Sequence, residues 1–175
     1  PPSGTLEMWV KPDWDAASVP SGPESTRTFL SVGDARGWGP GRPPAARMAL
    51  FFRDGQVNLF YGDTAGYAWG RDDVYDEAFP AVAGAGHFGK VGVPVDWRAG
   101  EWHHLAVVWE EERAWLLVDG APAPGGPLVA LEPPFRGGAG DRASIFLGAN
   151  RFGHHRSNGW DLPALATIDD VRILA

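Results

Sequence analysis

The sequence predicts an all-β protein, a sandwich of two antiparallel β-sheets that forms a single domain over residues 1–175. Short apolar runs with alternating side chains recur along the chain and are separated by turn residues. Glycine (24) and proline (16) are frequent, which is typical of turns and unfavourable for helices. Nine tryptophans add strand propensity. Together these observations predict many short strands joined by long loops.

The first strand is expected over residues 4–11, and Pro12 ends it. Because successive side chains of a strand point to opposite faces, its residues divide into two sets. One face carries the apolar side chains Leu6, Met8 and Val10. The other face carries Glu7, Trp9 and Lys11. This pattern is typical of a strand that packs one face on a core.

Two hairpins are expected in the middle of the chain. Asp54-Gly55 separates two apolar runs, and Asp-Gly favours a tight turn because glycine accepts positive φ angles. The second hairpin joins residues 102–109 to 114–118 around the charged tip 110–113, and Asp119-Gly120 ends it. Bulky residues on both faces of 102–109 predict a central strand. Further strands are expected over residues 28–32, 128–131, 143–147 and 167–174, and short helices only near 72–82 and 163–166.

Composition and charge exclude several classes of function. The formal net charge of −7 provides no attraction for phosphate backbones, so we expect no nucleic-acid partner. No apolar run is long enough to span a bilayer, and we expect no membrane insertion. The absence of cysteine excludes disulfides and thiol chemistry. Because the chain begins Pro1-Pro2-Ser3-Gly4, we expect it to be a module of a longer protein.

Three segments in order resemble one known family. They are GTLEMWVKPDW at 4–14, GEWHHLAVVW with the following WLLVDG at 100–120, and ATIDDVRIL at 166–174. In combination they are similar to laminin G-like jelly-roll domains of the concanavalin A-like lectin/glucanase superfamily. The resemblance implies two curved sheets, with the first and last strands as neighbours. One departure is that such domains commonly have another strand before the first one seen here.

The resemblance also implies a range of functions. Members mostly bind carbohydrate or protein, often with calcium, and usually as modules of larger secreted proteins. We therefore expect an extracellular or cell-surface location. The partner would be a glycan or polysaccharide, or neighbouring domains of the parent protein. The first hypothesis is a non-catalytic carbohydrate-binding or adhesive module, and the second is a structural or protein-interaction domain that packs against its parent.

A glycan-active enzyme, either a glycosidase or a lyase, is the third hypothesis, and the sequence argues against it. Related glycosidases place catalytic carboxylates at alternate positions of one strand. The acidic run 72–77 does not match this spacing, and Glu110, Glu111 and Glu112 lie at a hairpin tip where we expect them to be solvated. A lyase needs a Tyr or His base beside Arg or Lys; His87 or His155 could serve as the base, but the sequence shows no assembled signature of this kind. We therefore expect no enzymatic activity.

The expected glycan site lies in the loops 33–44, 62–86 and 148–163. Aromatic residues in these loops, beside polar groups, are typical platforms for sugar rings. The candidate ligand-binding residues are Trp38, Tyr67, Trp69, Arg151, His155, Asn158, Trp160 and Asp161. Six tryptophans lie in or beside strands, and we expect most of them to be buried instead: Trp9, Trp14, Trp97, Trp102, Trp109 and Trp115.

Other polar clusters have a structural and a functional interpretation. Asp72, Asp73 and Asp76 offer the oxygen ligands that calcium prefers, but the run lacks the spaced pattern and fixed glycine of an EF-hand, and a solvated loop is the alternative.

Two pairs of adjacent residues are expected to serve structure. His103 and His104 should point to opposite faces of a strand, which excludes joint metal binding. In 169–173, Asp169 is expected to face the core with Val171 and Ile173. Arg172 is expected to pair with Asp170 or with Glu7 of the first strand.

Overall fold

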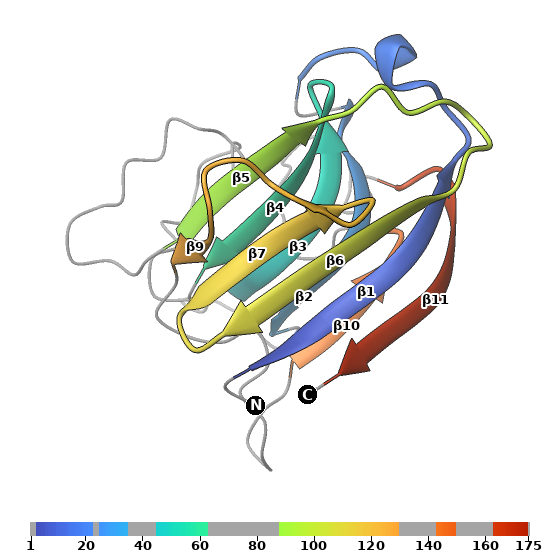
Figure 1. The fold of residues 1–175 in the computed structure, drawn as a ribbon. Helices are drawn as coiled ribbons and strands as arrows, with labels where there is room; N and C mark the ends of the chain where they lie inside the picture. Colours follow the sequence, from blue (N-terminus) through green and yellow to red (C-terminus); the bar gives the residue numbers. More distant parts are fainter. Residues whose placement is uncertain are drawn as a thin grey trace, which may run out of the picture.

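Two antiparallel sheets face each other in the computed structural model, which describes residues 3–22, 25–34, 45–62, 88–129, 143–149 and 163–174 (Figure 1). Almost all of the regular structure in these residues is β-strand, so the predicted all-β sandwich is confirmed. A single turn of 3-10 helix, η1 (Ala16–Ser18), follows the first strand.

The first sheet places the two ends of the chain side by side. Its order is β11-β1-β6-β7-β8, and β9 also pairs with β7. The strands are β1 (Ser3–Pro12), β6 (His103–Glu110), β7 (Arg113–Val118), β8 (Ala121–Pro122), β9 (Leu128–Val129) and β11 (Ala166–Leu174). The first and last long strands are therefore neighbours, as the resemblance implied. β1 and β7 flank β6, so the central position predicted for this strand is confirmed.

The second sheet has five strands in the order β10-β2-β3-β4-β5. They are β2 (Arg27–Asp34), β3 (Ala45–Arg53), β4 (Gln56–Gly62), β5 (Phe88–Pro94) and β10 (Ala143–Leu147). The hairpin between β3 and β4 turns at Asp54 and Gly55, which have φ angles of 54° and 75°. Both turn residues are thus in the left-handed region, which explains why Asp-Gly predicted this turn correctly.

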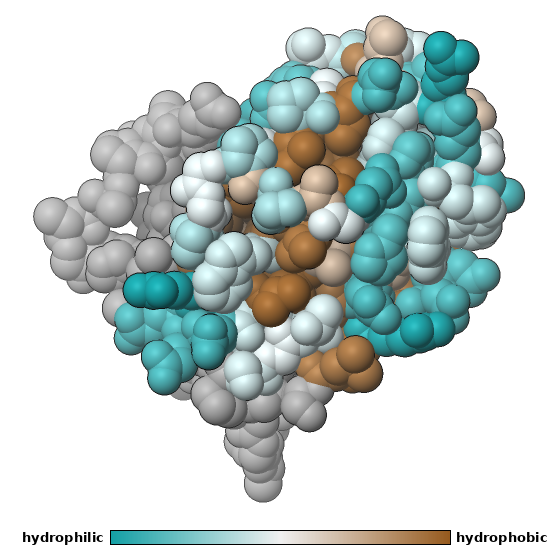
Figure 2. Space-filling view, viewed as in Figure 1, coloured by the Kyte–Doolittle hydropathy of each residue, from teal (hydrophilic) through white to brown (hydrophobic). Residues whose placement is uncertain are grey.

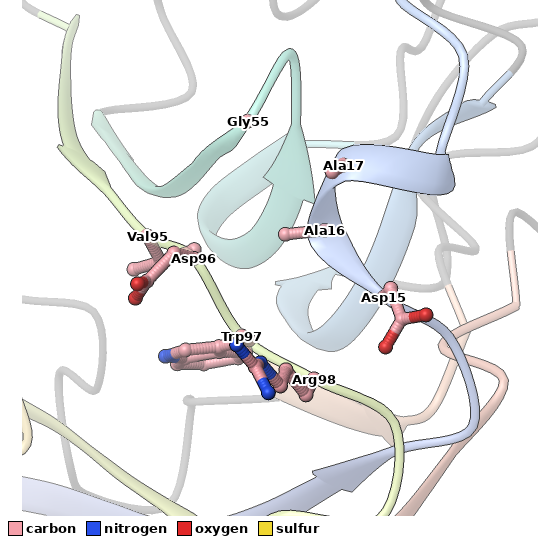
Figure 3. Close-up of a pocket in the computed structure, with 8 residues that line it drawn as sticks. All are labelled: Asp15, Ala16, Ala17, Gly55, Val95, Asp96, Trp97 and Arg98. Atoms are coloured by element: carbon pink, nitrogen blue, oxygen red, sulfur yellow. The ribbon is translucent and has the colours of Figure 1, made fainter.

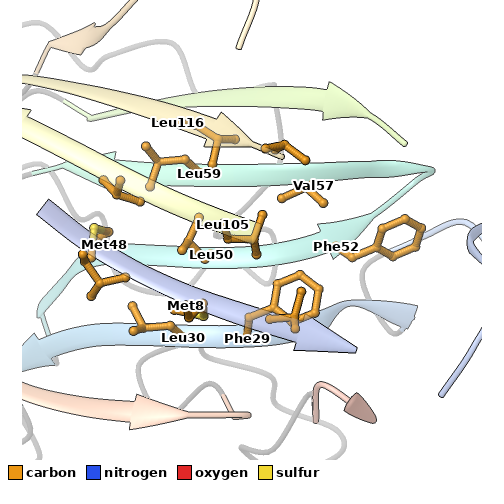
Figure 4. Packing of buried hydrophobic residues seen from close by; sticks show 14 of the residues in the cluster. Met8, Phe29, Leu30, Met48, Leu50, Phe52, Val57, Leu59, Leu105 and Leu116 are labelled. Carbon is orange, nitrogen blue, oxygen red and sulfur yellow. The ribbon is translucent and has the colours of Figure 1, made fainter. Parts of the chain in front are cut away.

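The core lies between the inner faces of the sheets (Figure 4). Met8 of β1 and Leu105 of β6 contribute to it from one sheet, and Leu50 and Phe52 of β3 contribute from the other. The predicted inner face of β1 is confirmed, since its three apolar residues Leu6, Met8 and Val10 are fully buried. Their burial is the main stabilising contribution that β1 makes to the fold.

Four elements differ from the sequence-based expectation. β5 was not predicted, because glycine and proline lower the strand propensity of its sequence, and neither were the short β8 and η1. β5 forms because β4 offers a free edge, while Val91, Val93 and the following Val95 pack against the core. The helix expected at 163–166 is wrong: Pro163 forms a bridge with Thr28, and Ala166 begins β11. The other helix candidate, 72–82, lies outside the described residues.

The inward orientation expected for Asp169 is also wrong. In β1, Glu7 pairs with Arg172 and Trp9 pairs with Asp169 of β11. Between these two pairs β1 has one residue and β11 has two, so β11 contains a bulge. Asp170 takes a φ of 51° at this bulge. The alternation shifts there, so that Asp169 and Asp170 are both exposed while Val171 still packs against the core. The Oδ1 of Asp169 accepts a hydrogen bond from the backbone N–H of Asp170 at 2.8 Å.

Asp54 ties the β3–β4 hairpin to the segment after η1. Its Oδ1 accepts a hydrogen bond from the Gly22 N–H at 2.8 Å, and its Oδ2 accepts one from Arg53 Nε at 3.2 Å. Partial burial acts to raise the pKa of this carboxyl. The two hydrogen bonds and the positive charges of Arg53 and Lys90 outweigh burial, so the pKa lies below its ordinary value of 3.8.

We predict that Asp54→Asn makes the stability of the protein less sensitive to acid. Because the pKa of Asp54 is lowered by folding, its charged form stabilises the fold above pH 3.8, and this contribution is lost as pH falls through the lower folded value. Asparagine tolerates the positive φ angle at this turn. Urea unfolding at pH values on both sides of 3.8 would measure the effect. An equal change in Glu112→Gln, at the exposed tip of the second hairpin, would contradict the assignment.

Candidate functional site

The site residues predicted from sequence lie outside the described residues. This holds for the candidate glycan ligands Trp38, Tyr67, Trp69, Arg151, His155, Asn158, Trp160 and Asp161. It holds equally for the candidate calcium ligands Asp72, Asp73 and Asp76. Among the residues that the structure does describe, no group of three or more His, Asp or Glu side chains is placed to hold a metal ion.

Two of the six tryptophans that lie in or beside strands are exposed rather than buried. Trp9 is 42% exposed and Trp102 is 43% exposed, whereas Trp14, Trp97 and Trp109 are buried and Trp115 is half-buried. The sequence contained a signal for Trp9, because it alternates with Glu7 and Lys11 on the polar face of β1. Trp102 lies just before β6 and has no comparable local signal.

The two exposed indoles lie on the same outer face of the first sheet. Trp9 pairs across the strands with His104, and the two ring centroids are 5.1 Å apart. The Lys11 Nζ lies 5.1 Å from the centroid of the Trp102 ring. We call this surface the tryptophan platform, and with the ion-paired residues beside it, it consists of Glu7, Trp9, Lys11, Trp102, His104 and Arg172. Figure 2 looks onto this sheet and shows polar side chains gathered over β1 and β11, and apolar ones over β6 and β7.

A chain of polar contacts runs along one side of the platform, from His104 through Glu7 and Arg172 to Asp170. Glu7 Oε2 lies 3.5 Å from His104 Nε2, and Glu7 Oε1 lies 3.5 Å from Arg172 Nη1. Arg172 Nη2 lies 3.3 Å from Asp170 Oδ1. The predicted pairing of Arg172 with Glu7 and Asp170 is therefore confirmed. Because solvent screens such exposed pairs, their main consequence is to orient polar groups beside Trp9 rather than to stabilise the fold.

The start of β6, next to the platform, is held rigidly by His103 and Asp119. The His103 ring stacks on the Trp97 indole, with centroids 4.2 Å apart and planes 7° apart. Its Nδ1 lies 3.0 Å from Asp119 Oδ2, and Asp119 Oδ1 accepts the His104 N–H at 2.8 Å. His103 and His104 thus lie on opposite faces and have structural partners, as predicted. Their fixed backbone positions the neighbouring Trp102.

A pocket of about 700 Å³ lies elsewhere, between η1, the β3–β4 turn and the segment 95–98 (Figure 3). Its lining residues are Asp15, Ala16, Ala17, Gly55, Val95, Asp96, Trp97 and Arg98. The Asp15 carboxylate already accepts the Ala99 N–H at 2.9 Å, and Trp97 is only 4% exposed. The pocket therefore offers no exposed aromatic ring, and we place the candidate site at the tryptophan platform.

Two further features bear on the function. Glu110, Glu111 and Glu112 are exposed, as expected for a solvated hairpin tip. Within the parts of the chain that the structure describes, no helix has the length and apolar character needed to cross a membrane.

Comparison with known proteins identifies the fold. A family model described as "Concanavalin A-like lectin/glucanases superfamily" (Laminin_G_3) matches residues 2–175. No curated protein sequence matches the chain. A Trypanosoma rangeli sialidase complexed with 2,3-difluorosialic acid is similar with a TM-score of 0.55 and 20% identity, over 98% of this chain and 20% of the sialidase. Domains LG4-5 of the mouse laminin α1 chain are similar with a TM-score of 0.51 and 14% identity, over 98% of this chain and 35% of that one.

These similarities concern the fold and not the activity, because identity is low. The chain spans about a fifth of the length of the sialidase and about a third of the laminin fragment. Shared folds host unrelated functions, so a function has to be argued from the site itself.

Proposed function

The chain belongs to the concanavalin A-like lectin/glucanases superfamily, and we propose from this that it is a non-catalytic carbohydrate-binding or adhesive module of an extracellular protein. The observation that carries the proposal is the pair of exposed indoles, Trp9 and Trp102, on one face of one sheet. Isolated exposed apolar residues are common, but two exposed indoles with polar neighbours on a single face are typical of binding surfaces.

The chemistry of the platform suits a sugar. The C–H face of a pyranose ring stacks on an indole, while its hydroxyl groups require donors and acceptors at the ring edge. Glu7 and His104 supply these groups beside Trp9, and Lys11 supplies a donor beside Trp102. The loop residues predicted from sequence, among them Trp160, remain candidates for a second part of the site, and Asp72, Asp73 and Asp76 remain candidates for calcium.

A non-catalytic role is part of the proposal. A glycosidase requires one free carboxylic acid and a second carboxylate on either side of the scissile bond. On this surface Glu7 is engaged by both His104 and Arg172, and β1 has no second carboxylate at an alternate position. The two carboxylates of the neighbouring β11 are engaged as well, since Asp170 pairs with Arg172 and Asp169 accepts the Asp170 N–H. This arrangement favours holding a sugar over cleaving it.

The second candidate function is packing against neighbouring domains of the parent protein. It is favoured by apolar side chains that are exposed on the edge strands β10 and β11 and just before β11. These are Ile145, Leu147, Leu165, Ile173 and Leu174. A domain of this kind would bind protein through the apolar edges and would not need the platform.

We predict that Trp9→Ala weakens binding to the preferred polysaccharide about tenfold, because loss of an aromatic stacking contact worth about 1.4 kcal/mol changes Kd by this factor. The measurement is binding of the purified protein to a panel of immobilised polysaccharides, with calcium and with chelator. Leu147→Ala, which truncates a comparably exposed side chain of the other sheet, is the matched control and should bind normally.

The outcomes separate the two functions. Binding that Trp9→Ala weakens and Leu147→Ala does not would support a carbohydrate-binding module. Loss of binding in chelator would support calcium at Asp72, Asp73 and Asp76. Binding to no polysaccharide in either buffer would overturn the proposal and favour the packing function.

A further inference from the structure

The spacing of the two indoles indicates how much of a glycan the platform contacts. Trp9 pairs with His104 across β1 and β6, and Trp102 lies two positions before His104. Trp9 and Trp102 are therefore diagonal neighbours on one face, with backbones about 7–8 Å apart. One pyranose ring covers one indole, so a single sugar cannot stack fully on both. A chain with at least two sugar units can.

The charges around the indoles indicate which glycans fit. Asp169 pairs with Trp9 on the β11 side and carries an exposed carboxylate. With Glu7 and Asp170, three carboxylates on this surface outnumber its two permanent cations, Lys11 and Arg172. Arg172 is already engaged by two of those carboxylates. An acidic sugar stacked on Trp9 would bring its negative charge towards Asp169 and Glu7, where like charges repel.

The polar side chains of the platform can nevertheless form hydrogen bonds with the hydroxyl groups of an uncharged sugar. Carboxylates accept hydrogen bonds from sugar hydroxyls, and the His104 ring and the Lys11 amino group can each donate one. Lys11 Nζ lies over the face of Trp102, so its charge is partly balanced by the indole.

We infer that the tryptophan platform binds an uncharged, extended glycan chain through at least two of its sugar units, one on each indole. This inference rests on the proposed carbohydrate-binding function and specifies its substrate class. Binding should tighten from a monosaccharide to a tetrasaccharide, and either tryptophan should be needed for the gain.

The test is isothermal titration of the protein with two series of probes. The first series contains neutral glucan, xylan, mannan and galactan fragments, from monosaccharide to hexasaccharide. The second contains sulfated and uronic-acid chains of matched length. The variants are Trp9→Ala, Trp102→Ala and Lys11→Gln, with Leu147→Ala as control. Thermal unfolding verifies that each variant is folded.

The expected result is neutral-chain binding that increases with length and falls about tenfold in either tryptophan variant. Lys11→Gln should weaken binding of the neutral chain by no more than the loss of one hydrogen bond, about two- to tenfold, and this effect should not depend on salt. Added salt should also have little effect on this binding.

Three results would overturn the inference. A monosaccharide that binds as tightly as the tetrasaccharide would exclude the two-indole arrangement. Preference for acidic chains, with loss in Lys11→Gln and in high salt, would exclude an uncharged ligand while leaving the proposed function intact. Binding to no carbohydrate of either series would overturn both the inference and the proposed function.

Discussion

Trp109→Ala is expected to lower the free energy of unfolding by about 3–5 kcal/mol, the usual cost of removing a large buried aromatic side chain. Trp109 lies in β6 and is fully buried between the sheets. Its removal both loses the transfer free energy of the indole and leaves a cavity that the flanking strands cannot fill. Because the cost approaches the total stability of a typical domain, the variant is expected to unfold at a much lower urea concentration.

Trp9→Ala is the matched control for this experiment. The same side chain is removed from the same sheet, but Trp9 is 42% exposed on the outer face. We expect its loss to cost less than about 1 kcal/mol. Urea unfolding followed by far-UV circular dichroism avoids the overlapping fluorescence of nine tryptophans. Equal costs for the two variants would contradict the assignment of Trp9 to the outer surface.

Gly4→Ala is expected to destabilise the protein by about 1–3 kcal/mol through overpacking. Gly4 pairs with Trp109 across β1 and β6. A Cβ atom at position 4 would overlap the Trp109 ring and would lie 2.6 Å from the carbonyl oxygen of Leu174. Both obstacles are rigid, since one is a buried ring and the other is the backbone of β11. The chain therefore requires glycine here for lack of space.

Gly92→Ala provides the comparison for Gly4→Ala. A Cβ at position 92 would also meet neighbouring atoms, but these are the side-chain ends of Gln56 and Asn58. The Gln56 side chain can rotate away, so we expect Gly92→Ala to lower the free energy of unfolding by less than Gly4→Ala does.

A Trp109→Phe background provides a second comparison. Part of the loss of unfolding free energy caused by Gly4→Ala should disappear there, because the smaller ring leaves room for the added methyl group. A cost for Gly4→Ala no greater than for Gly92→Ala would show that β1 adapts to the added methyl group.

Local patterns predicted much of the fold. The alternation of β1 identified its buried face, and Asp54-Gly55 identified a hairpin whose turn residues do have positive φ angles. These predictions succeeded because side-chain alternation and turn conformation depend on residues adjacent in sequence. The family resemblance supplied the pairing of the first and last strands, which no local pattern contains.

The candidate site was less predictable than the fold. Trp102 was expected in the core because most tryptophans in or beside strands are buried, and only the position of β6 beside β1 places it over Lys11. Asp169 was expected to face inward, and a bulge in β11 turned it outward. Both errors have one cause, since exposure depends on which sheet face is covered and on the pairing register.

The sequence alone was sufficient to predict the all-β class, the turns and the inner face of β1. Each of these follows from short-range backbone preference and from the burial of apolar side chains. Tertiary structure alone decided that β5 forms on the free edge of β4, despite a sequence rich in glycine. It also brought Trp9 and Trp102 to one outer face and placed three carboxylates on the Trp9 side of that face. Such features join residues far apart in the chain, and their energies arise only when strand pairing brings those residues into contact.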